Sequence, residues 1–313
     1  MSITVLRTSD GWWVQTPTGA AEIDTAAATT AELLADRAAI EAAAAATHTI
    51  PVETLDVISP VTAPCRVVAQ MTNFVSHVKD SGMNPETVPL TFFRKSSGSI
   101  SGPYQDVIKP DHVRFLDYEV EIGLVFGRPV PVGTKITEDN IGDFVAGLVV
   151  TNDVSARDVQ LPKTQFYEAK SYPTFTPVGP ALVLLEAGDF KRFDDLRLTL
   201  RVNGSIRQDM TVGSDMIYRP VQAMQALTKF QRLDAGDLLL TGTPGGTALK
   251  APPAPIAIVA SLLPPGLKWK SFFRAQEKNA NYLQDGDVME LSVTTDDGAL
   301  DLGIQRTVVR FTR

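Results

Sequence analysis

Three acidic residues alternate with apolar ones in the stretch 117–125, which has the sequence DYEVEIGLV. The β-branched and aromatic residues among them predict a strand, on which Asp117, Glu119 and Glu121 point to the same face. Carboxylates gathered on one face destabilise the fold unless a positive charge lies between them. The stretch therefore predicts a site for a hard divalent cation such as Mg²⁺, Mn²⁺ or Ca²⁺. The alternative is a solvated strand face with Lys or Arg neighbours.

Asp153 is the natural third ligand for such a cation. It follows the apolar run 144–150, which predicts a buried strand, and an Asp at the end of that strand can reach a site on a neighbouring one. With three histidines and one cysteine, a zinc site rich in those ligands is not expected. The alternative for Asp153 is an N-cap of the turn that follows it.

His77 and Asp80 lie three residues apart in a segment that is compatible with a helix. On one helix face the two side chains can touch, and a carboxylate bonded to one imidazole nitrogen makes the other a better base. The pair can then take a proton from a water close to the cation. An incidental His–Asp pair on a surface helix is the alternative.

Basic and glycine-rich segments further along the chain suit an anionic substrate. Arg157 and Gln160 follow Asp153, and Lys170 precedes a turn that contains prolines. An arginine fork and an ammonium group both bind carboxylates, although a solvated loop lysine explains Lys170 equally well. The loop 241–246 can turn backbone N–H groups toward a ligand oxygen, and a plain tight turn is the alternative there.

Composition describes an ordinary globular protein. The chain has 313 residues, 44% of them hydrophobic, and a net charge of −7 without a basic stripe, so nucleic acid is not an expected partner. No phosphate-binding glycine motif is present. One cysteine and the absence of a signal peptide predict a cytoplasmic protein, and the apolar run 251–267 contains too many prolines to span a membrane.

The pattern of elements predicts a small N-terminal α+β domain with its connector over 1–64 and a β-rich domain over 65–313. Two short apolar runs around Ser9-Asp10-Gly11 predict a hairpin, and an alanine-rich helix follows from 31 to about 46, capped by Thr30. Beyond residue 66, recurring prolines and glycines favour many short strands over a doubly wound sheet. The fold class is therefore α+β and rich in strands.

With these residues in place, the chain from about 67 to its C-terminus resembles the fumarylacetoacetate hydrolase family. The resemblance rests on an ordered series of short motifs: Asn-Phe-x-x-His77, Phe93-x-Lys95, Asp-Tyr-Glu119-x-Glu121, Asn-Asp153-x-Ser-x-Arg157-Asp-x-Gln160, Lys170-Ser, Gly179-Pro, Val202-Asn-Gly, Met216-Ile and Thr-Gly-Thr243-Pro.

The resemblance implies a mixed β-sandwich roll, usually homodimeric, with Mg²⁺, Mn²⁺ or Ca²⁺ held by Glu119, Glu121 and Asp153. It implies a water-activating dyad at His77, where this chain has Asp80 in place of the usual Glu. The oxo-acid end of a small-molecule substrate is expected at the basic and polar positions, with Lys170 also counted as catalytic: Arg157, Gln160, Lys170, Lys95 and Thr243.

The expected activity is hydrolysis of a C–C bond in an acylpyruvate or β-diketo acid, with a divalent ion stabilising the enolate as a Lewis acid. Isomerisation of a 2-hydroxydienedioate or decarboxylation of an oxaloacetate-like acid is the alternative within the family, and a non-catalytic binding module is the alternative outside it. A long proline-rich insert after Thr243 departs from the family pattern. It can line the pocket, extend a dimer contact or cover apolar surface.

Overall fold

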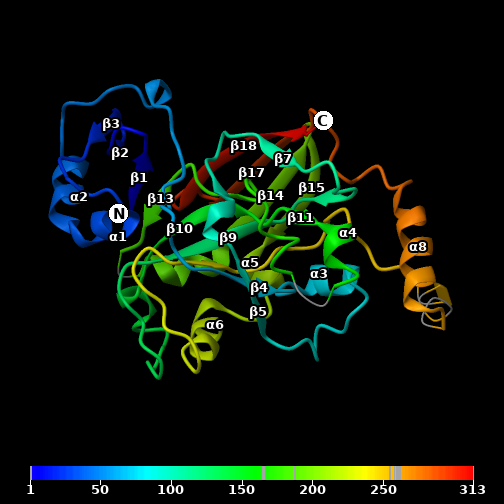
Figure 1. Cartoon of the computed structure of the whole chain (residues 1–313). Helices are drawn as coiled ribbons and strands as arrows, with labels where there is room; N and C mark the ends of the chain where they lie inside the picture. Colours follow the sequence, from blue (N-terminus) through cyan, green and yellow to red (C-terminus); the bar gives the residue numbers. More distant parts are fainter. Residues whose placement is uncertain are drawn as a thin grey trace.

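The chain folds around two β-sheets that pack face to face (Figure 1). The structure is a computed structural model that describes residues 2–163, 166–186, 188–253, 255–256, 258 and 262–312. The larger sheet has nine strands, in the spatial order β3 (Gly19–Glu22), β2 (Trp12–Thr16), β1 (Ile3–Arg7), β13 (Leu182–Leu184), β10 (Val145–Asn152), β9 (Val120–Phe126), β16 (Leu238–Leu240), β4 (Val67–Met71) and β5 (Thr91–Lys95).

The second sheet has five strands, in the order β15 (Ser205–Thr211), β14 (Leu196–Val202), β17 (Val288–Thr295), β18 (Asp301–Phe311) and β7 (Val107–Lys109). Two short ladders complete the strands, β8 (Leu116–Asp117) with β11 (Ser155–Ala156) and β6 (Ile100–Ser101) with β12 (Thr176–Pro177). The helices are α1 (Thr30–Ala35), α2 (Arg37–Ala44), α3 (Val75–Asp80), α4 (Arg157–Gln160), α5 (Val212–Asp215), α6 (Pro220–Leu227) and α8 (Pro265–Gln276). The predicted β-rich α+β class is confirmed.

The central strands of the larger sheet are buried on both faces. All seven residues of β9 are buried. Ile122 and Leu124 belong to a core shared with the five-stranded sheet, whereas Val125 belongs to a second core that Leu33 and Ile40 of α1 and α2 cover. Because neither face meets water, any charged side chain at the end of β9 lies at low dielectric and needs a partner.

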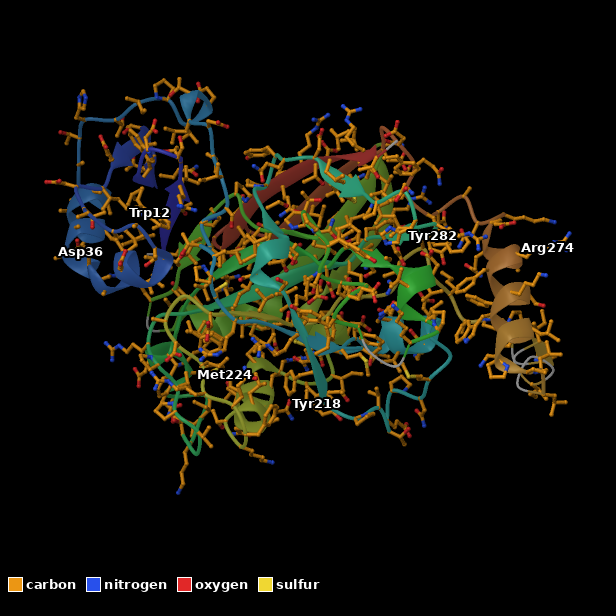
Figure 2. The ribbon with its side chains drawn as sticks, viewed as in Figure 1. Trp12, Asp36, Tyr218, Met224, Arg274 and Tyr282 are labelled. Atoms are coloured by element: carbon orange, nitrogen blue, oxygen red, sulfur yellow. The ribbon has the colours of Figure 1, made fainter. Side chains whose placement is uncertain are left out.

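The N-terminal hairpin forms as predicted, with β1 and β2 paired antiparallel. Its Trp12 is buried, and the indole N–H donates to the carbonyl of Ala27 at 2.8 Å (Figure 2). β1 also pairs with β13, so the nine-stranded sheet crosses the predicted boundary between 1–64 and 65–313. That division stays a prediction.

The predicted single alanine-rich helix is wrong in one respect, because the structure has two helices. Thr29 caps α1 in a capping box with Glu32, one residue before the predicted cap. Asp36 then leaves the helical conformation, and its carboxylate accepts a hydrogen bond from the N–H of Ala39 to begin α2. A side chain that caps a new helix competes with continuation of the old one. Within the described part of the chain, no helix has the length and apolar character that a membrane span requires.

We predict that Gly147→Ala destabilises the protein by about 1–3 kcal/mol. Gly147 lies on β10, the strand that leads to Asp153, and a Cβ there would lie 2.4 Å from the carbonyl oxygen of Val183 on β13. Urea unfolding measures the effect as a lower midpoint at unchanged m value. Gly142→Ala is the matched control, because its Cβ would meet no atom within 4 Å. Equal midpoints for the two variants would contradict the prediction.

Candidate active site

The chain between β8 and β9 places Glu119 by hydrogen bonds rather than by a strand ladder. The predicted continuous strand over 117–125 is interrupted, because β8 ends at Asp117 and β9 begins at Val120. The N–H of Glu119 donates to Asn152 Oδ1 at 3.0 Å, and its carbonyl accepts from the N–H of Asp153 at 2.9 Å. These bonds hold Glu119 against the residue that was expected to share its cation.

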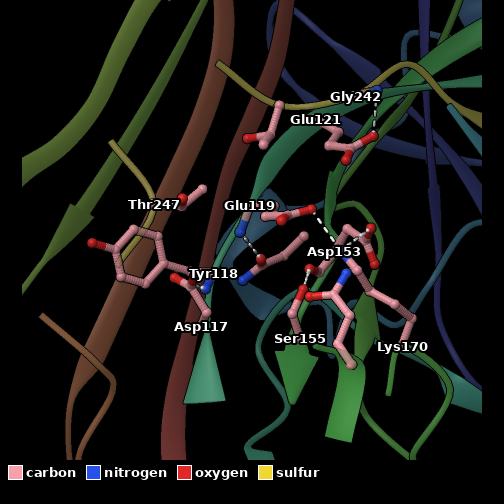
Figure 3. A network of polar contacts seen from close by, with 12 residues as sticks. Asp117, Tyr118, Glu119, Glu121, Asp153, Ser155, Lys170, Gly242 and Thr247 are labelled. Carbon is pink, nitrogen blue, oxygen red and sulfur yellow. Dashed lines mark hydrogen bonds and ion pairs between the residues drawn. The ribbon is translucent and has the colours of Figure 1, made fainter. Parts of the chain in front are cut away.

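Glu119, Glu121 and Asp153 converge as predicted (Figure 3). Each offers a carboxylate oxygen, the three atoms lie within 4.8 Å of one another, and the residues are at most 5% exposed. Asp117 does not join them. It accepts hydrogen bonds from the N–H groups of Ala248 and Leu249 at 2.8 and 3.1 Å.

Buried cations surround the three carboxylates. The alternative of a solvated strand face is therefore wrong, although the Lys and Arg neighbours that it named are present. Lys170 Nζ lies 2.7 Å from Glu119 and 2.6 Å from Asp153. Arg157 bonds Glu119 at 2.5 Å and Asp117 at 2.8 Å. Lys95 donates to the other oxygen of Asp153 and, at 2.9 Å, to the carbonyl of Phe175. Glu119 and Asp153 are therefore already paired.

Glu121 differs from its two neighbours. Its Oε2 accepts from the N–H of Gly242 at 2.6 Å, but within the described ranges it forms no ion pair. Burial, and then the charges of Asp153 and Glu119, raise the pKa of Glu121 well above its ordinary value. An all-carboxylate cluster with one charge left uncompensated fits a hard dication, which would stabilise the ionised form.

The pKa of Glu119 is shifted in the opposite direction from that of Glu121, because Glu119 has charged partners. Burial alone would raise the pKa of Glu119, but Lys170 and Arg157 outweigh it and hold that pKa well below its usual range. Burial likewise opposes the charge of Lys170, whose pKa is nevertheless raised because Asp153 and Glu119 both lie against it. Lys170 is therefore a fixed cation in the site.

His77 lies on α3 as expected, but its predicted pairing with Asp80 is not formed. Of the described residues, none gives His77 Nδ1 a hydrogen bond, although that atom is shielded from solvent. Asp80 instead accepts from the N–H of Gly246 at 3.0 Å and lies 3.6 Å from Lys250 Nζ. Burial, with opposing contributions from nearby carboxylates and cations, lowers the pKa of His77, so its ring is neutral at pH 7.

Of the five predicted substrate contacts, Lys95 does not line the main pocket and four do: Arg157, Gln160, Lys170 and Thr243. Gln160 and Lys170 line the main pocket, and the Gln160 carbonyl oxygen accepts from Arg157 at 2.8 Å, which leaves its amide nitrogen as the donor for a ligand. Lys95 lies behind Asp153 and does not line this pocket. The Thr243 hydroxyl donates to Val120 at 2.9 Å and accepts from Gln208 at 2.8 Å. Arg157, whose guanidinium bonds Asp117, Glu119 and Gln160, also lines the pocket.

Sequence reasoning missed the contacts that fix α3. The Ser76 hydroxyl donates to Asp215 and accepts from the N–H of Gly245 at 2.7 Å, while Asp215 also accepts from the N–H of Ser76 at 3.0 Å. These partners are more than 130 residues apart in the chain. Their only sequence signal is that Asp215 directly precedes the Met216-Ile motif.

Comparisons with known proteins identify the family of the chain. Residues 66–310 match the family model described as Fumarylacetoacetate (FAA) hydrolase C-terminal. The rat protein named oxaloacetate tautomerase Fahd2a, mitochondrial, is 34% identical over 206 residues, which are 65% of this chain. The match spans 64% of that relative's length.

Solved structures with similar folds cover the whole chain. A probable 2-hydroxyhepta-2,4-diene-1,7-dioate isomerase from Mycobacterium abscessus is 27% identical, with a TM-score of 0.75 and complete coverage of both chains. Fumarylacetoacetate hydrolase from Exiguobacterium antarcticum, at 22% identity and a TM-score of 0.70, also covers both chains completely and shares the fold. The family match over most of the sequence, on a fold shared from end to end, shows that this chain belongs to the fumarylacetoacetate hydrolase family.

Proposed function

We propose that this chain is a divalent-metal-dependent isomerase or tautomerase of a 2-oxo acid. The observation that carries the proposal is that His77 Nδ1 has no hydrogen-bond partner among the described residues, because Asp80 bonds Gly246 instead. Without a carboxylate partner, His77 lacks the dyad expected to activate water, whereas proton transfer within a substrate requires only the imidazole. The names of the rat tautomerase and the M. abscessus isomerase point to the same chemistry.

Glu119, Glu121 and Asp153 would hold the ion, with Mg²⁺ as the first candidate and Mn²⁺ or Ca²⁺ as the others. When bound, the ion would supply Lewis-acid stabilisation of negative charge that develops on the oxo acid. The carboxylate-only ligand set disfavours softer metals.

Lys170 and Gln160 would bind the oxo-acid end of the substrate. Lys170 is held in place by two carboxylates and keeps its charge, so it can attract a substrate carboxylate without moving. Gln160 is oriented by Arg157, so its amide N–H group can donate to a substrate oxygen. Fixed donors of this kind stabilise charge without reorganisation during the reaction.

His77 would move the proton. For conversion of an enol to its keto form, the enol O–H bond breaks and a C–H bond forms at the adjacent carbon, so the molecular formula is unchanged. A neutral imidazole can accept the first proton and return one to carbon. Its lowered pKa keeps it in the accepting form at neutral pH.

Hydrolysis of an acylpyruvate or β-diketo acid is the second candidate. Asp80 lies one turn from His77 on α3, and a water-activating dyad would require Asp80 to exchange its contacts with Gly246 and Lys250 for one with the ring. The homodimer and the cytoplasmic location remain predictions.

The first test offers three substrates to the Mg²⁺ and Mn²⁺ forms of the protein: enol-oxaloacetate, 2-hydroxyhepta-2,4-diene-1,7-dioate and an acylpyruvate. We expect turnover of at least one of the first two, followed by absorbance, and loss of that turnover after EDTA treatment. Cleavage of the acylpyruvate alone would replace the proposal with the hydrolase.

The second test is His77→Gln. Removal of a general acid–base group is expected to lower kcat by about 10²–10⁴-fold, while Mn²⁺ affinity by calorimetry stays unchanged because His77 is not a ligand. His112→Gln is the matched control, since His112 is exposed and bonds Tyr172 at 2.8 Å. A kcat for His77→Gln within a few-fold of wild type would remove His77 from the mechanism.

The third test follows from the raised pKa of Glu121. A carboxyl group that holds its proton in the metal-free protein must release it on binding the ion, so affinity falls as the pH is lowered through that pKa. Calorimetric titration with Mn²⁺ in two buffers of different ionisation enthalpy measures the release. Glu121→Gln should abolish it and the exposed Glu53→Gln should preserve it. Heats that do not depend on the buffer would contradict the assignment.

A further inference from the structure

The pocket over the carboxylates is large and changes character along its length. Its volume is about 770 Å³, and its lining runs from Glu119, Glu121 and Asp153 to Trp269 and Phe272 on α8. Pockets of about 300–1,000 Å³ accommodate drug-sized molecules. A four-carbon oxo acid would therefore leave most of this volume unused.

Apolar surface begins directly beside the polar end. Lys170 Nζ lies 5.4 Å from the centroid of the Phe93 ring. Phe93 packs edge-to-face against Phe166 at 5.4 Å, and both rings line the pocket. A substrate bound to Lys170 by its carboxylate would thus meet aromatic side chains within a few bonds of its oxo group.

The far wall comes from the insert, whose residues 254, 257 and 259–261 lie outside the described residues. Trp269 and Phe272 of α8 lie 6.0 Å apart at 88°, and both are half-buried. Leu161 and Leu249 add aliphatic surface to the same pocket. The insert therefore has the first of the three roles expected for it, because it lines the pocket.

Contacts with the body hold α8 in this position. Phe273 packs 5.7 Å from Phe115, which packs 5.0 Å from Tyr282, and Glu277 pairs with Arg114. Figure 2 shows Tyr282 between the strands of the body and α8. Because Trp269 stacks on Phe273 at 5.8 Å and 21°, the aromatic wall is supported from behind.

We propose that the natural substrate is a 2-oxo acid with a bulky apolar tail, aromatic in its best-fitting form, that packs between Phe93 and Trp269. The proposal rests on the proposed function, because it places the oxo-acid end at Lys170. To that function it adds the chemical character of the end of the substrate that lies away from the oxo acid. Aromatic pairs with centroids 4.5–7 Å apart stabilise a complex beyond the area that they bury.

Binding of unreactive analogues in the presence of Mn²⁺ tests the proposal without turnover. Oxamate presents the oxo-acid group alone, and N-benzyloxamate adds a ring on a short arm. Calorimetry is expected to show N-benzyloxamate binding at least about tenfold more tightly than oxamate. Trp269→Ala should remove most of that preference and leave oxamate affinity unchanged, and Trp269→Phe should restore part of it.

Phe230→Ala is the matched control, because Phe230 is an aromatic residue that is 64% exposed and does not line the pocket. Equal affinities of the two analogues would contradict the proposal of an apolar tail, and so would a preference for N-benzyloxamate that survives in Trp269→Ala. Either result would leave the proposed function unchanged. If neither analogue binds, the oxo-acid site fails and the tail proposal fails with it.

Discussion

The constraint on which the site depends is the balance of charges buried at the end of β9. Four acidic and three basic side chains meet there, each at most 5% exposed: Asp117, Glu119, Glu121, Asp153, Lys95, Arg157 and Lys170. Glu121 is the acid for which none of these cations forms an ion pair, and its pKa is raised well above its ordinary value by burial and by the charges of Asp153 and Glu119. A dication that displaces the proton of Glu121 would leave the cluster with one net positive charge, which favours an anionic ligand. The same shortage of positive charge thus supports both the proposed metal and the proposed anionic substrate.

The convergence of the carboxylates was predictable because it follows from two local patterns, alternation on one strand and an acid after a buried run. The interruption of the strand at Glu119 could not be predicted from such local patterns. It arises because Asn152 and Asp153, more than thirty residues away in sequence, supply the bonds that a ladder would otherwise make. Asp117 lies on the other side of this interruption, and it accepts a hydrogen bond from the N–H of Ala248 instead of joining the other carboxylates. Periodicity gives the face of a residue, but only tertiary hydrogen bonds decide where a strand stops.

The predicted pair of His77 and Asp80 also shows that local spacing does not determine a tertiary contact. Helical spacing correctly places His77 and Asp80 one turn apart, and α3 forms as expected. Spacing alone permits the contact without requiring it, and the N–H of Gly246 competes successfully for the carboxylate. Gly246 adopts φ +103°, and a Cβ there would lie 2.0 Å from the carbonyl of Arg207. The glycines of the loop 241–246 indicate that such an approach is possible, but only the folded chain determines that Asp80 accepts the N–H of Gly246.

One segment, residues 242–251, connects the chemistry to the shape of the pocket. Its N–H groups donate to Glu121 from Gly242, to side chains on the helix of His77 from Gly245 and Gly246, and to the carbonyl of Asp80 from Ala251 at 2.8 Å. The insert that bears the aromatic wall begins where this segment ends. Because the same backbone positions Glu121, the helix of His77 and the start of the aromatic wall, a longer insert would alter the distal pocket while the bonds at its root hold Glu121 and His77 in place.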